Sequence, residues 1–96
     1  MVQANPNNPA LIERVAAVLR RRGAQEVYVF GSQATGVARP ESDTDFAVSG
    51  LPAAVFYRAC GEALAAAAAP IDIIDIDRDT PFTRHLRASG ELRRVG

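Results

Sequence analysis

The sequence predicts a mixed α/β domain in which a small three-stranded mixed sheet packs against about four helices. Three observations lead to this prediction. Helix-type and strand-type hydrophobic patterns alternate along the chain, Gly or Pro separates them, and no repeat or linker divides the 96 residues. With 48% apolar residues, the chain can form a hydrophobic core without disulfides or a structural metal. We therefore expect a loose polar tail at residues 1–8 and a single domain at residues 9–96.

The first two predicted elements are a helix and a buried strand. Pro9 suits the first turn of a helix, apolar residues recur after it at helical spacing, and Gly23 follows three consecutive arginines at its end. Positively charged side chains are favourable at the negative end of a helix dipole, and this is the preferred interpretation of the three arginines. The alternative is that they contact a phosphate or a partner protein. Residues 27–30 are β-branched or aromatic and end at Gly31, which favours a short buried strand.

A second strand and an alanine-rich helix are predicted next. The strand covers residues 44–49, and the helix covers residues 53–69. Within the helix, Phe56, Cys60 and Leu64 are spaced by four and share one face. This spacing predicts that Cys60 is a small core residue rather than a catalytic thiol.

The remaining elements complete a strand–helix–strand unit and add a last helix. Residues 71–76 form the third predicted strand. A helix opens at residues 79–81 and closes at Gly90. Residues 31–36 hold about one further helical turn at most.

The composition narrows the class of function. A net charge of zero argues against a nucleic-acid scaffold or a membrane-surface protein, and the apolar run at residues 63–69 is too short to span a bilayer. All eleven basic residues are arginine, which excludes a P-loop and lysine-based catalysis. The single cysteine excludes an intramolecular disulfide and a cysteine-based zinc site, and it fits a reducing, cytoplasmic compartment.

Two aspartates open the second predicted strand, although aspartate is disfavoured in strands. Asp43 and Asp45 are two residues apart, so their side chains share one face with Cα atoms about 7 Å apart. Carboxylates in this position repel each other unless a cation binds them, and hard oxygen ligands suit Mg²⁺ or Mn²⁺. The alternative interpretation of this pair is two solvated residues at a turn.

A Gly-Ser pair at the end of the first strand strengthens the metal interpretation. Gly31 lets a phosphate approach the backbone, and Ser32 offers a hydroxyl and can start a short helix whose N–H groups attract anions. For this pair to face the same site as Asp43 and Asp45, the first two strands must be antiparallel neighbours. The second and third strands, joined through a helix, form a crossover unit and run parallel.

The third strand supplies the last candidate ligand. Asp72 falls at its N-terminal end, beside the two aspartates of the second strand. Asp75 is three residues further on, so it faces the other side of the strand. Asp75 and Asp77 are therefore expected to be edge or loop residues, and Asp72 is the preferred third carboxylate.

Taken together, these segments resemble the nucleotidyltransferase superfamily of DNA polymerase beta type. The resemblance lies in "VYVFGSQATG", "SDTDFAV" and "PIDIIDID", which carry a Gly-Ser pair, ten intervening residues, a D-x-D pair and a third aspartate in an apolar strand. Their order and spacing cover most of the chain. The whole chain looks like the minimal members of that superfamily, the stand-alone MNT domains.

The resemblance implies a minimal nucleotidyltransferase fold and a division of roles among five residues. Asp43 and Asp45 would bind two magnesium ions that hold the triphosphate of ATP or another nucleoside triphosphate. Asp72 would share one metal and help to activate the attacking hydroxyl. Gly31 and Ser32 would hold the β- and γ-phosphates. The implied reaction is attack on the α-phosphorus with pyrophosphate as the leaving group.

The same resemblance implies a partner. Minimal members typically pair with a helical HEPN protein, a ribonuclease toxin, and some act as antitoxins by transferring AMP to a tyrosine of that toxin. We therefore expect protein adenylylation, with no membrane and no direct nucleic-acid binding, and with a homo-oligomer as a possible state. One alternative is a nucleotidyltransferase that modifies a small hydroxylated molecule such as an aminoglycoside. A second alternative is a module that neutralises its partner by contact alone.

Overall fold

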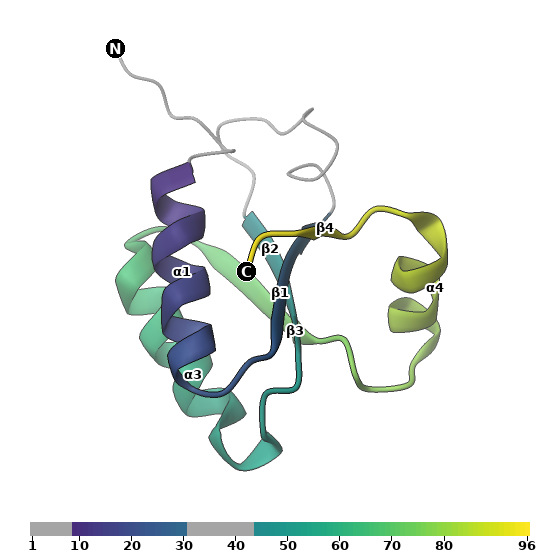
Figure 1. Cartoon of the computed structure of the whole chain (residues 1–96), viewed down its shortest axis with the longest axis horizontal. Helices are drawn as coiled ribbons and strands as arrows, with labels where there is room; N and C mark the ends of the chain where they lie inside the picture. The colour runs from purple at the N-terminus through teal and green to yellow at the C-terminus, as the bar shows by residue number, and fades with distance from the viewer. Residues whose placement is uncertain (1–8, 31–43) are drawn as a thin grey trace.

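A computed structural model describes residues 9–30 and 44–96. Its helices and strands alternate along the chain as the hydrophobic patterns predict (Figure 1). The elements are α1 (Pro9–Arg21), β1 (Glu26–Phe30), β2 (Thr44–Ser49), α3 (Ala53–Ala67), β3 (Ile71–Asp75), α4 (Pro81–Ser89) and β4 (Arg93–Arg94). Within the described ranges, no helix is long and apolar enough to cross a membrane.

The strands form one mixed sheet in the order β3-β2-β1-β4. β1 and β2 are antiparallel neighbours, whereas β2 and β3 run parallel, as the predicted topology requires. The prediction of three strands was wrong, because Arg93 and Arg94 pair with β1 as a fourth strand. Two arginines carry no hydrophobic strand pattern; backbone pairing and an ion pair between Arg94 and Glu26 of β1 (3.5 Å) hold this short edge strand.

The helix count also differs from the prediction. The described residues contain three helices rather than about four. The helical turn expected at residues 31–36 accounts for the difference, and it lies outside the described residues, as does the predicted tail at residues 1–8.

Helices α1 and α3 lie side by side and cover one face of the sheet (Figure 1). α1 ends where Gly23 adopts a φ of 118°, a conformation that suits glycine. The N–H of Ala24 then donates to the carbonyl of Leu19 and closes the last turn. The main core lies between these helices and the sheet, and its fully buried strand residues are Val27, Val29, Phe46 and Val48.

The buried face of α3 is not the predicted one. Its buried residues are Ala59, Ala63 and Ala67, which pack in the main core. Cys60 is only half-buried and Leu64 is exposed, so the prediction that Cys60 is a core residue was wrong. Alanine side chains let α3 approach α1 closely, and this places the larger side chains beside the edge strand β3.

Helix α4 lies on the opposite face of the sheet (Figure 1). Leu86 anchors it in a second, smaller buried cluster with Phe30, Ala47 and Ile76. A capping box starts the helix: the Thr83 N–H donates to the Thr80 hydroxyl (3.1 Å), and the Thr80 N–H donates to the Thr83 hydroxyl (3.0 Å). Helices α1 and α3 therefore cover one face of the sheet, whereas α4 is the helix on the other.

Candidate active site

The structure brings two of the predicted ligands together on neighbouring strands. Asp45 on β2 and Asp72 on β3 are direct partners in the parallel register. Residues paired in this way lie on the same face of a sheet, with strands about 4.8 Å apart. That face is the one covered by α4, because Ala47 and Ile74, the next residues of this face on the same strands, belong to the smaller cluster.

The other predicted site residues cannot be placed in the same way. Gly31, Ser32 and Asp43 lie outside the described residues. β1 ends at Phe30, which pairs with Asp45 in the antiparallel register. Gly31 is therefore covalently bonded to Phe30, the residue that lies directly beside Asp45.

Asp45 and Asp72 differ in their surroundings. Asp45 is half-buried at the start of β2, where Phe30 and Asp72 flank it on the two neighbouring strands. Asp72 is exposed on the edge strand, and within the described residues no hydrogen bond or ion pair engages its carboxylate. Two carboxylates on neighbouring strands concentrate negative charge at this end of the sheet, which favours the binding of a cation.

The donor set fits a hard divalent cation. Both described carboxylates come from rigid strands and lie on one face, and carboxylate oxygens are the ligands that Mg²⁺ and Mn²⁺ prefer. In the part of the chain that the structure describes, no group of three acidic, histidine or cysteine side chains is close enough to hold a metal. The third predicted ligand, Asp43, lies outside that part.

Asp75 and Asp77 are not part of this carboxylate pair. Asp75 pairs with Val48, a residue of the main core, so it faces the α3 side of the sheet. Asp77 follows β3, and its carboxylate accepts hydrogen bonds from the Ser49 hydroxyl (2.9 Å) and the Gly50 N–H (2.7 Å). Asp77 thus fixes the end of β2 against the end of β3, a structural role that the sequence pattern did not reveal.

Two further side chains of a type that often takes part in catalysis lie apart from the carboxylate pair. His85, the single histidine of the sequence, is exposed on α4. Cys60 belongs to α3, which covers the opposite face of the sheet, and burial raises the pKa of its thiol, which opposes formation of a reactive thiolate.

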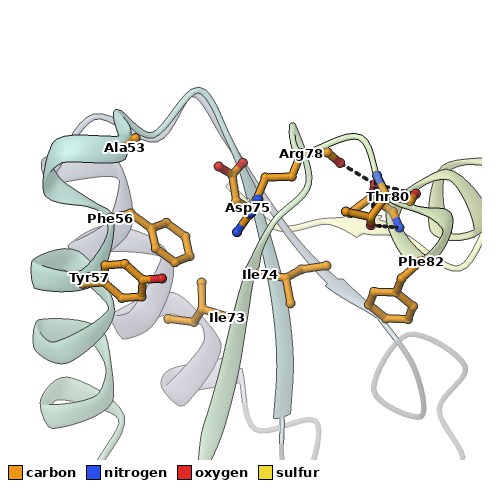
Figure 2. A pocket seen from close by; sticks show the side chains of 10 residues that line it. Ala53, Phe56, Tyr57, Ile73, Ile74, Asp75, Arg78, Thr80 and Phe82 are labelled. Atoms are coloured by element: carbon orange, nitrogen blue, oxygen red, sulfur yellow. Dashed lines mark hydrogen bonds between the residues drawn. The ribbon is translucent and has the colours of Figure 1, made fainter.

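A cavity of about 540 Å³ lies along β3, and sequence reasoning missed it. Figure 2 shows Phe56 and Tyr57 of α3 on one side of β3 and Phe82 of α4 on the other. Asp75 and Arg78 are its charged residues. The three aromatic rings come from segments far apart in the sequence, so no local pattern indicates that they share a cavity.

Comparisons with known proteins identify a family and a shared fold. The family model described as polymerase beta nucleotidyltransferase matches residues 13–92. No curated protein matches the sequence.

Several solved structures share the fold. One is a toxin-antitoxin crystal structure with AMP-PNP, with a TM-score of 0.69 and 19% identity over 86% of this chain and 70% of that chain. A mutant of the toxin-antitoxin MntA-HpeT has a TM-score of 0.68 and 19% identity over 88% and 70%. A third structure, the tri-AMPylated HEPN toxin of Shewanella oneidensis in complex with its MNT antitoxin, has a TM-score of 0.60 and 18% identity over 88% and 67%.

At identities this low, these likenesses show a shared fold. The family match is broader evidence, because it spans both the carboxylate-bearing strands and the two helices of the main core. The chain belongs to the polymerase beta nucleotidyltransferase family.

Proposed function

We propose that this protein transfers AMP from ATP to a hydroxyl group of a helical HEPN-type toxin and so acts as its antitoxin. The observation that carries the proposal is the register pairing of Asp45 with Asp72, within a chain of a nucleotidyltransferase family. The fold shared with antitoxins in toxin complexes supports the choice of partner.

The proposed site includes two residues of β2 and β3 and three residues outside the described ranges. Asp43, Asp45 and Asp72 would be the metal ligands, and Gly31 and Ser32 would hold the terminal phosphates. Bound Mg²⁺ or Mn²⁺ would neutralise the triphosphate and stabilise the charge that develops on its oxygens. The rigid pairing of β2 with β3 would fix two of the three carboxylates before substrate binds, which lowers the reorganisation needed for transfer.

The proposed reaction forms one bond and breaks one. The acceptor oxygen bonds to the α-phosphorus, the bond from that phosphorus to the bridging oxygen breaks, and pyrophosphate leaves with the bonding electron pair. Asp72 lies on the exposed edge strand, where an acceptor hydroxyl can approach it from solvent. In this proposal Asp72 positions that hydroxyl, and the Asp72 carboxylate accepts the proton that the hydroxyl loses as its oxygen bonds to phosphorus.

The test is an AMP-transfer assay with the purified chain, a helical HEPN toxin and Mg-ATP, read by mass spectrometry of the toxin. We expect one hydroxyl residue of the toxin to gain AMP and its toxic activity to fall. The double variant Asp43→Ala and Asp45→Ala should still bind the toxin without modifying it.

Other outcomes would support other functions. Modification of an aminoglycoside without any protein partner would favour a small-molecule enzyme. Full neutralisation of the toxin by the double variant would favour neutralisation by contact alone.

A further inference from the structure

We infer that the exposed ring of Phe82 forms the wall of the substrate site and stacks on the base of the nucleotide. This inference rests on the proposed function, because it assumes that the triphosphate binds at Asp45 and Asp72. It assigns a role to a residue outside the sequence motifs of the family. Four features of the structure support it.

The first feature is the row of residues that crosses the sheet on the α4 side. Phe30 pairs with Asp45, and Asp45 pairs with Asp72, so the three side chains share one face. Neighbouring strands lie about 4.8 Å apart. An aromatic ring and two carboxylates therefore adjoin each other at this end of the sheet.

The second feature is the position of Phe82 above that face. Its ring packs edge-on against Phe30, with centroids 6.0 Å apart and an interplanar angle of 65°. It also lines the cavity together with Ile74 (Figure 2). Phe30 is the register partner of Asp45, so the Phe82 ring lies on the α4 side of the sheet, close to the row that contains Asp45.

Given the strand spacing, the Phe82 ring lies on the order of 10 Å from the strand positions of the two carboxylates. A nucleoside triphosphate bound through its phosphates at the carboxylates can place its base at this separation.

The third feature is the exposure of the ring. Phe82 is 50% exposed, although it contacts a Phe30 that is only 7% exposed. A half-exposed aromatic ring that is held by a buried neighbour is suited to stacking on a planar ligand.

The fourth feature is the rigid support of Phe82. It sits in the first turn of α4, between Pro81 and the buried Thr83. The capping box joins Thr83 to Thr80, and the Thr83 hydroxyl also donates to the Arg78 carbonyl. A ring on so restrained a turn loses little conformational entropy when it stacks on a ligand.

The experiment is calorimetry of the full chain with Mg²⁺ and either a non-hydrolysable ATP analogue or inorganic tripolyphosphate. Phe82→Ala should weaken binding of the analogue roughly tenfold, because stacking on an aromatic side chain contributes substantially to base binding. It should leave tripolyphosphate binding unchanged. Phe82→Leu, which keeps apolar volume without a π-face, should also lose affinity for the analogue, and Phe82→Trp should retain it.

Tyr57→Ala is the matched control. Tyr57 lines the same cavity from the α3 side of β3, is 81% exposed, and has no register link to the carboxylates. This variant should bind both ligands like the wild type. Guanosine and adenosine analogues should bind within a few-fold of each other, because stacking does not read the base edge.

Three results would overturn the inference. Unchanged affinity of Phe82→Ala for the analogue would exclude base stacking and leave the proposed transfer intact, even if that variant no longer modified the toxin. Equal loss of analogue and tripolyphosphate would assign Phe82 a role in holding the fold. A wild-type chain that binds neither ligand would reject the proposed function itself, and the inference with it.

Discussion

Helices α1 and α3 cover one face of the sheet, and helix α4 covers the other. The first face holds most of the buried core, and the second carries the candidate site residues. On one face, α1 and α3 bury Phe46 and Val48 completely. On the other face, α4 covers a smaller cluster around Leu86, while Asp45 is only half-buried and Asp72 is exposed. Because strand side chains alternate, one strand can supply core residues to one face and carboxylates to the other.

The largest difference between the faces is expected in stability. Phe46→Ala removes a fully buried ring from the main core and should lower the free energy of unfolding by about 3–5 kcal/mol. Leu86→Ala, in the smaller cluster, should cost about 2 kcal/mol because α4 can move inward to fill the space. Urea denaturation measures both. Equal losses would show that the two faces contribute equally to the fold.

The next prediction concerns the chemistry of the two faces. Asp72→Asn should reduce AMP transfer by on the order of 100-fold or more, because it removes a proposed metal ligand. The unfolding free energy should stay the same or rise, since a charge next to Asp45 is lost. Asp75→Asn, on the α3 side of the same strand, should keep transfer within about threefold. Equal loss of transfer in both variants would contradict the separation of the faces.

A third prediction tests the link between the ends of β2 and β3. Asp77→Ala removes acceptors for the Ser49 hydroxyl and the Gly50 N–H and should cost about 1–2 kcal/mol of unfolding free energy. The matched control is Asp79→Ala, which breaks one exposed ion pair with Arg84 and should change stability by less than about 0.5 kcal/mol. Thermal unfolding of the two variants checks the ranking.

The smallest expected effect is on the α1–α3 layer. The Arg22 guanidinium donates to the Glu62 carboxylate (2.7 Å) and lowers the pKa of that carboxyl below its ordinary value of 4.5. A lowered folded pKa means that the pair stabilises the fold above pH 4.5 and that this stabilisation is lost as the pH falls through the folded pKa.

Glu62→Gln should therefore flatten the acid limb of the stability–pH curve slightly. The difference between variant and wild type should shrink with added salt, because both side chains are partly exposed. Chemical denaturation from pH 3 to 7, a range set by the ordinary carboxyl pKa, measures it. A difference that persisted at high salt would point to a stronger, buried interaction between the helices.

Much of the candidate site follows from local patterns. Apolar runs bounded by Gly and Pro located β1, β2 and β3 within about a residue of their observed bounds. Strand periodicity and the parallel crossover were then enough to predict that Asp45 and Asp72 share a face and that Asp75 does not. The metal-binding and phosphate-binding roles of the motif residues stay predictions.

The sequence by itself determined the order of the elements from α1 to α4 and the position of Asp72 beside the aspartates of β2, because both depend on spacing along a few residues. Only the tertiary structure decided which side of α3 is buried, because an alanine-rich helix is apolar on several sides and close packing against α1 selects the smallest side chains. It also decided that Phe82 rests on Phe30. That contact joins β1 and α4, which are far apart in the sequence, and tertiary packing rather than any local pattern brings them together.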